Sequence, residues 1–136
     1  MPLELRPATV DDIEDVLTLW REATQPSSTD SAETLTALMR RDPGALIVAD
    51  GDGRVIGSVI AGWDGWRGAI YRLAVGPSQR RRGLGQALLR AAEDRLAGLG
   101  ARRMHAIVVE TNDDAVAFWT ASDWAHQAGQ LRFTKG

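Results

Sequence analysis

YRLAVGPSQRRRGLGQALL, from Tyr71 to Leu89, is the stretch that decides the fold of this chain. Apolar residues alternate with others from Tyr71 to Val75, which predicts a strand, and a glycine–proline pair ends it. Leucine and alanine then recur at helical spacing, which predicts a helix over residues 85–99. The stretch therefore predicts a strand that leads through a basic turn into the N-terminus of a helix.

The helix start in this stretch favours an anionic ligand. A helix N-terminus exposes unpaired N–H groups and carries roughly half a positive charge. After a glycine-rich turn, it is a ready phosphate site. Gly83 and Gly85 let an anion approach the backbone closely, and Arg80, Arg81 and Arg82 add positive charge. We therefore expect a cradle for a phosphate-bearing ligand.

Strands and helices follow one another along the whole chain. Strands are predicted at 3–6, 45–49, 55–61, up to Val75, at 104–109, and as a short pair within 124–134. A first helix is predicted after Thr9 as N-cap, with Asp12 in its first turn, and it buries Ile13, Val16, Leu17 and Trp20. A second helix is predicted after Asp30, which pairs with Glu33 as a cap, and it buries Leu35, Leu38 and Met39. A third is predicted over 85–99, with its apolar face at Leu88, Ala92, Leu96 and Leu99 and Gly100 as its C-terminal cap, and a fourth begins at Asn112. This order predicts a layered α/β fold, with a mixed, mostly antiparallel central sheet and helices on both faces.

Composition narrows the class of protein. A chain of 136 residues is long enough for one domain with a real core. The net charge of −2 and pI near 5.6 argue against a general nucleic-acid binder. The absence of cysteine excludes disulfides, thiolate ligands and a cysteine-bound intermediate, and the two histidines have no obvious second ligand, so we expect no metal. No apolar run reaches the roughly 18 residues of a membrane span, and we expect a cytoplasmic protein.

The motif and the order of elements together resemble the GNAT superfamily, the Gcn5-related N-acetyltransferases. Residues 80–85, RRRGLG, match its acetyl-CoA signature Arg/Gln-x-x-Gly-x-Gly/Ala. The opening LRPATVDD, the segment NDDAVAFW and the turn GWDGWRG before YRLAV are also similar to members of the family, the last to a small bacterial subgroup. The resemblance covers residues 1–136 and implies one domain with the GNAT acyl-CoA N-acyltransferase fold.

This resemblance implies acetyl-CoA as co-substrate. Backbone N–H groups from Arg81 to Gln86 would hold its pyrophosphate, and the arginine side chains its outer phosphates. The strand at Leu73 to Val75 would bind the pantetheine arm and offer an N–H to the thioester carbonyl. The implied cofactor-binding residues are Leu73, Ala74, Val75, Arg80, Arg81, Arg82, Gly83, Leu84, Gly85, Gln86, Asn112 and Trp119.

Two positions depart from the family pattern. Trp119 stands where relatives often have a tyrosine that protonates the departing thiolate, and an indole is not a useful acid. Tyr71, the one tyrosine, or water would supply the proton, or the thiolate leaves without a protein acid. Asp123 stands where relatives usually have glycine, before Trp124.

Three carboxylates are candidates for the base that an attacking amine requires. They are Asp64, Glu110 and Glu22, and each is alternatively a solvated surface group. Trp63 and Trp66 flank Asp64 and either line an acceptor pocket or pack the hairpin. The catalytic candidates are thus Asp64, Glu110 and Tyr71, and the substrate-binding candidates are Trp63, Trp66 and Glu22.

Several functions compete for the glycine motif. A dinucleotide-binding fold is disfavoured because the motif lacks its third small residue and does not follow the first strand. A P-loop is excluded by the missing Gly-Lys-Ser/Thr, and an RNA-binding role is disfavoured by acidity and the lack of aromatic residues beside the arginines. Direct acetyl transfer to a primary amine in a ternary complex remains, with a non-catalytic acetyl-CoA sensor as the alternative. We expect a small-molecule amine or a peptide N-terminus as partner, no nucleic acid and no membrane; a homodimer is left open.

Overall fold

The computed structural model describes residues 3–80, 82–109 and 112–136. Its strands are β1 (Leu3–Pro7), β2 (Leu46–Gly51), β3 (Arg54–Trp63), β4 (Gly68–Val75) and β5 (Met104–Ala106). Its helices are α1 (Ile13–Ala23), α2 (Ala32–Arg41), α3 (Leu84–Leu99) and α4 (Asp113–Ala121), with short 3-10 turns η1 (Val10–Asp12) and η2 (Pro77–Gln79).

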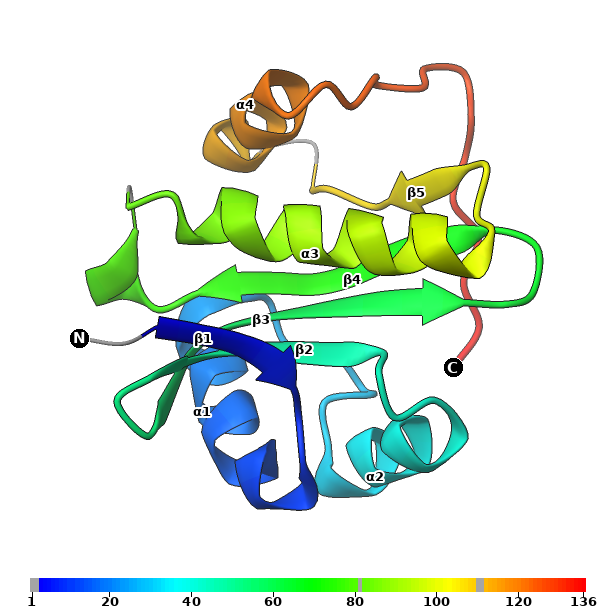
Figure 1. Cartoon of the computed structure of the whole chain (residues 1–136). Coiled ribbons are helices and arrows are strands. Elements are labelled where there is room, and N and C mark those ends of the chain that lie inside the picture. Colours follow the sequence, from blue (N-terminus) through cyan, green and yellow to red (C-terminus); the bar gives the residue numbers. More distant parts are fainter. Residues whose placement is uncertain (1–2, 81, 110–111) are drawn as a thin grey trace. The chain divides into compact units, whose positions relative to one another are not determined.

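The strands form one five-stranded sheet in the order β1-β2-β3-β4-β5. Neighbours pair antiparallel except β4 and β5, which run parallel. The predicted mixed, mostly antiparallel sheet is confirmed. In Figure 1, α3 covers one face of this sheet, while α1 and α2 cover the other.

Two compact units make up the chain. The first, Met1–Ala106, contains the sheet and helices α1 to α3, and the second, Ile107–Gly136, contains α4 and the C-terminal tail. The single domain expected over 1–136 stays a prediction. No helix in the described part of the chain combines the length and apolar character needed to cross a membrane.

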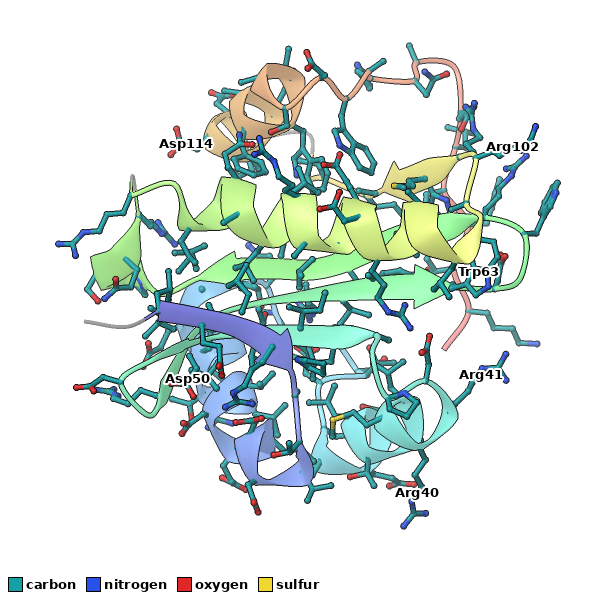
Figure 2. All side chains as sticks on the ribbon, viewed as in Figure 1. Arg40, Arg41, Asp50, Trp63, Arg102 and Asp114 are labelled. Atoms are coloured by element: carbon teal, nitrogen blue, oxygen red, sulfur yellow. The ribbon has the colours of Figure 1, made fainter. Side chains whose placement is uncertain are left out.

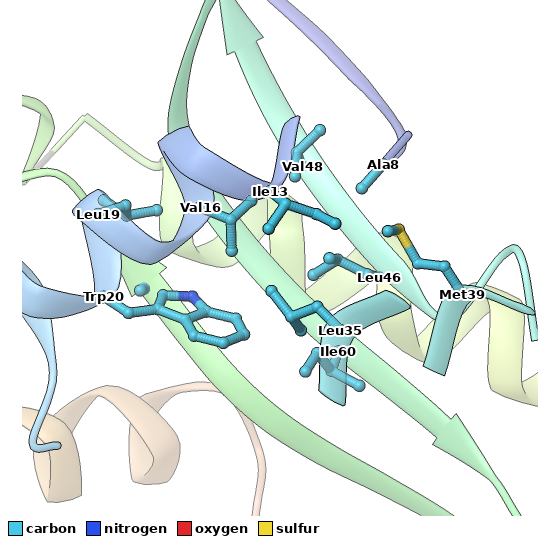
Figure 3. Close-up of a cluster of buried hydrophobic side chains, with 11 residues drawn as sticks. Ala8, Ile13, Val16, Leu19, Trp20, Leu35, Met39, Leu46, Val48 and Ile60 are labelled. Atoms are coloured by element: carbon cyan, nitrogen blue, oxygen red, sulfur yellow. The ribbon is translucent and has the colours of Figure 1, made fainter. Parts of the chain in front are cut away.

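The core between the sheet and α1–α2 is apolar and largely sealed from solvent. Figure 3 shows Trp20 of α1 and Leu35 of α2 beside Ile60 of β3. The predicted faces of both helices are correct in most positions, with two corrections. Leu17 is only partly buried, packed against the core, and Leu19 lies in the core instead, three residues after Val16 on the same side of the helix. Leu38 of α2 is likewise partly buried.

The entry into α1 is fixed by a charged network. Thr9 is the N-cap, as predicted, and its N–H donates to Asp12 Oδ2 at 2.7 Å. Arg6 donates to both oxygens of Asp12, at 2.8 and 2.9 Å, and to Asp50 at 3.1 Å. The hydrogen bonds from Arg6 lower the pKa of the mostly buried Asp12 carboxyl below its usual range. This network ties β1 and β2 to the start of α1.

The cap of α2 differs from the prediction. Ser31, not Asp30, is the N-cap, and its hydroxyl accepts the N–H of Thr34 at 3.1 Å. Asp30 cannot serve as a cap because its carboxylate binds Arg72 of β4. The prediction of an Asp30–Glu33 capping pair was therefore wrong, because the Asp30 carboxylate pairs with an arginine that is distant in sequence.

Helix α3 follows the predicted pattern closely. Gly100 ends it in the left-handed conformation at φ 106°, as expected, and Leu88, Ala92 and Leu96 are buried. Leu99, predicted on the same face, is 44% exposed at the last residue of the helix.

The C-terminal third contains less strand than predicted. Strand β5 ends at Ala106 instead of 109, and no residue of the tail from Trp124 onward forms a strand. A strand requires a partner, and two large apolar side chains of the tail are left in solvent: Leu131 and Phe133 are 83% and 88% exposed. The pair of short strands predicted within 124–134 was wrong.

Candidate active site

The middle of β4 contains a bulge. Ala74 pairs with Ser58 and Tyr71 pairs with Ile60, so β4 has two residues where β3 has one. Arg72, the first of the two, has a φ of 51°, in the left-handed region that side chains rarely adopt. A bulge of this kind interrupts the ladder and turns backbone groups away from it.

A buried serine holds the carbonyl of the bulge. Ser58 is fully buried, and its hydroxyl donates to the carbonyl oxygen of Arg72 at 2.9 Å. Trp20 Nε1 in turn donates to Ser58 Oγ at 2.8 Å. Trp20 lies in the core, as its helical spacing predicts, whereas no periodic pattern singles out Ser58 or Arg72. The available signal was a lone serine in the apolar strand VIGSVIAG, which must find a hydrogen-bond partner when buried.

One edge of β4 is open beyond its first residues. β4 pairs with β5 only over Gly68 to Ile70, opposite Met104 to Ala106. Among the described residues, no strand pairs with that side of Leu73–Val75. An unpaired strand edge offers N–H and C=O groups to a ligand that runs along it.

The open edge leads through a short turn into the start of α3. β4 is followed by Gly76, whose N–H donates to the carbonyl oxygen of Ile56 at 2.9 Å, and then by η2. Gly83 is the N-cap of α3, with a φ of 79°, and a Cβ placed on it would meet no atom within 4 Å. Leu84 is buried, which anchors the first turn of the helix. No acidic side chain lies in that turn, so no carboxylate of the turn offsets the positive end of the helix dipole.

The residues of the predicted phosphate cradle that the structure describes lie on both sides of Arg81. Arg80 and Arg82 are exposed, Gly85 is half-buried, and Gln86 is exposed on the first turn of α3. Arg81 itself lies outside the described residues. Contact of this cradle with a pyrophosphate stays a prediction.

Asp64 closes the turn between β3 and β4. Its Oδ1 accepts the N–H groups of Trp66 and Arg67, both at 2.7 Å. These hydrogen bonds lower the pKa of the exposed Asp64 carboxyl, which weakens it as a base. Trp66 is 71% exposed with the Arg67 guanidinium 4.2 Å from its ring centroid, and Trp63, labelled in Figure 2, is half-buried.

The other candidates lie at different distances from the bulge. Asp64 precedes β4, and the distance along the strand from Gly68 to Leu73 is roughly 16 Å, at about 3.3 Å per residue. Tyr71 is adjacent to the bulge, 52% exposed, with its ring against the backbone of Gly62. Glu22 is exposed on α1. Of these candidates, Tyr71 is the one that the strand brings beside the bulge.

The second unit carries the remaining predicted residues. Asn112 is the N-cap of α4, as predicted, and its Oδ1 accepts the N–H of Ala115 at 3.1 Å. Trp119 is half-buried and meets the ring of Trp124 edge-on at 4.7 Å. Asp123 has a φ of 67°, which accounts for the glycine usual there in relatives.

Glu110, the third candidate base, lies outside the described residues. In the described part of the chain, no group of three or more histidine, aspartate or glutamate side chains could hold a metal ion.

The model of the acetyltransferase (GNAT) family matches residues 13–123. The chain belongs to the GNAT acetyltransferase family. An acetyltransferase of Pectobacterium atrosepticum is 34% identical over 119 residues, which cover 86% of this GNAT chain and 84% of that protein.

Solved structures agree with this fold. Ard1 from Thermoplasma volcanium superposes on this GNAT chain with a TM-score of 0.83 at 22% identity, covering 94% of this chain and 86% of that one. The PaiA N-acetyltransferase from Thermoplasma acidophilum, solved in complex with coenzyme A, gives 0.77 at 19% identity, covering 89% and 88%. The predicted GNAT fold is confirmed, and the protein is an acetyltransferase.

The hairpin of this GNAT acetyltransferase allows a clean test of Asp64. Asparagine keeps an oxygen that can accept the two turn hydrogen bonds, so Asp64→Asn removes only the charge. We expect unchanged acetyl-CoA affinity, a turnover number within about tenfold of wild type, and a KM for a cationic amine that rises about two- to fivefold, as for an exposed ion pair. Steady-state kinetics measure all three.

Asp52→Asn is the matched control, because Asp52 is an exposed aspartate in the opposite hairpin, between β2 and β3. It should leave every parameter unchanged. A loss of about 10²-fold or more in turnover for Asp64→Asn alone would instead make Asp64 the base.

Proposed function

We propose that this protein transfers the acetyl group of acetyl-CoA to a primary amine by direct attack in a ternary complex. The observation that carries the proposal is the order of structural features along β4 and into the start of α3. A bulge in β4 is followed by an open strand edge, a basic turn, and a helix N-terminus at Gly83 that has no side-chain cap.

The parts of this path match the parts of acetyl-CoA in order. The N-terminus of α3, with Arg80 and Arg82, suits the phosphates through backbone N–H groups and charge-assisted hydrogen bonds. The edge at Leu73 to Val75 suits the amides of the pantetheine arm, which can pair with a strand as a peptide does. The bulge then lies where the thioester would be, and the N–H of Leu73 is our candidate donor to its carbonyl oxygen.

In the reaction, the amine nitrogen forms a bond to the carbonyl carbon and the carbon–sulfur bond breaks. An N–H donor aimed at the carbonyl oxygen stabilises the negative charge that develops there. The amine loses one proton to a base, for which Glu110, Glu22 and water are the candidates, because the turn hydrogen bonds weaken Asp64 as a base. The thiolate takes up one proton, and Tyr71, beside the bulge, is the candidate side chain.

The acceptor approaches, in this proposal, from the face of β4 that carries Tyr71, next to the loop between α1 and α2. Tyr71 is on that face, the Asp30 carboxylate in the loop is neutralised by Arg72, and Glu22 is exposed on the preceding helix. The exposed carboxylate of Glu22 favours a cationic acceptor, either a small-molecule amine or a peptide N-terminus.

A screen of acetyl-CoA consumption across amines and short peptides tests the proposal. We expect thiol release, detected with a chromogenic disulfide, that depends on both acetyl-CoA and an amine and yields the acetylated amine by mass spectrometry. Calorimetric binding of acetyl-CoA without turnover of any amine would favour the sensor, for which Trp119 in place of a tyrosine is the supporting observation. Absence of acetyl-CoA binding would overturn both.

A further inference from the structure

Arg72 occupies an unusual position for an arginine. It lies in the middle of the sheet, in a left-handed conformation that is unfavourable for any side chain, at the point where β4 leaves the ladder with β3. Such a conformation persists only where the surroundings enforce it, and it concentrates at functional sites.

The guanidinium of Arg72 is held from three directions. Its Nε donates to Asp30 Oδ1 at 3.1 Å, its Nη2 donates to Asp30 Oδ2, and its Nη1 donates to the carbonyl of Gln25 at 2.9 Å. It also lies 5.3 Å from the ring centroid of Trp20, within range of a cation–π contact. The side chains of Arg72 and Asp30 are only 18% and 17% exposed, so solvent screens their ion pair weakly.

These contacts join two segments that are far apart in sequence. Gln25 and Asp30 belong to the loop between α1 and α2, and the N–H of Ser27 donates to the same Asp30 carboxylate at 3.2 Å. The carbonyl of Arg72 is fixed separately, by Ser58. One residue therefore fastens the bulge of β4 to the loop beside which the acceptor would bind.

We propose that Arg72 is a positioning residue for acetyl transfer. Its side chain and carbonyl together hold the peptide between Arg72 and Leu73 in the orientation that aims the Leu73 N–H at the thioester carbonyl. The same contacts fix the α1–α2 loop against that strand. This inference rests on the proposed function, because it assumes that acetyl-CoA lies along β4.

The chain offers a matched control for removing such an arginine. Arg95 of α3 is also 18% exposed in its side chain, forms an ion pair with Asp42, and donates to the carbonyl of Ala61 at 2.7 Å. Arg72→Met and Arg95→Met thus each delete one mostly buried ion pair and one hydrogen bond to a carbonyl. We expect similar decreases in the midpoint of thermal unfolding.

The two variants should differ in how they recognise the acetyl group. Calorimetric Kd values for CoA and acetyl-CoA isolate the contribution of the thioester carbonyl and need no acceptor. We expect wild type and Arg95→Met to bind acetyl-CoA more tightly than CoA. In Arg72→Met, the ratio of the two Kd values should fall by about three- to tenfold, the effect of one hydrogen bond. The Kd of Arg72→Met for CoA should stay within twofold of wild type. With an acceptor, we expect its turnover to fall about 10²-fold, as for loss of one oxyanion donor.

Arg72→Lys is the second variant, and it replaces Arg72→Met in the same assays if the latter does not fold. Lysine keeps the charge beside Asp30 but cannot form the paired hydrogen bonds, so we expect an intermediate loss. Equal preference for acetyl-CoA in wild type and the Arg72 variants, or an equal loss in Arg95→Met, would overturn the inference. A wild-type chain that binds neither ligand would instead overturn the proposed function on which it rests.

Discussion

Gly83→Asp should abolish CoA binding while leaving the fold intact. Gly83 caps α3 in the left-handed conformation, and an added Cβ would meet no atom within 4 Å, so the side chain fits without a clash. Aspartate tolerates this conformation better than most residues, and a carboxylate at a helix N-cap is favourable. The same carboxylate would occupy the space predicted for the pyrophosphate and repel it.

We expect the Kd for CoA to rise at least 100-fold, a loss of about 2.8 kcal/mol in binding free energy. Titration calorimetry measures the affinity, and thermal unfolding should change little. Gly53→Asp is the control, because Gly53 also has a left-handed φ, of 84°, and open space around it, but lies in the β2–β3 hairpin. An unchanged affinity in folded Gly83→Asp would show that the phosphates bind elsewhere.

The sequence predicts the parts of this fold that depend on local pattern. The alternation before Gly76 predicts β4, and the helical spacing up to Gly100 predicts α3 nearly to the residue. The glycine motif between them identifies the family, because its spacing reflects a local strand–turn–helix geometry.

Features that depend on distant partners were not predicted. Asp30 is as good an N-cap as Ser31 by residue type, and its ion pair with Arg72, 42 residues away, engages it elsewhere. The bulge is a shift of register between two strands, which neither strand records in its own alternation. Likewise, the apolar residues around Leu131 follow a strand pattern but have no partner strand.

Leu88→Ala should be among the most destabilising substitutions in the first unit. Leu88 is fully buried on α3, and its Cδ1 lies so close to β3 that a Cβ on Gly57 would approach it to 2.8 Å. Removing the side chain leaves a cavity between helix and sheet, at a cost of about 2–5 kcal/mol in the free energy of unfolding. Urea denaturation measures this loss. Leu99→Ala, at the exposed end of the same helix, should cost much less.

Gly57→Ala provides a reciprocal test of the same contact. Alone, it should destabilise by about 1–3 kcal/mol, because its methyl group collides with Leu88 and also lies 3.3 Å from Leu84 Cδ2 and the Ala74 carbonyl. Combined with Leu88→Ala, the methyl group enters the space that the leucine vacated, so Gly57→Ala should cost clearly less than it does alone. Additive losses in the double variant would show that α3 does not rest on β3 at this point. Leu84, in the first turn of α3, packs at the same place. The absence of a side chain at Gly57 therefore also determines where the start of α3 lies relative to the end of β4. That position decides whether the protein can bind a phosphate at α3 and the pantetheine along β4 at the same time.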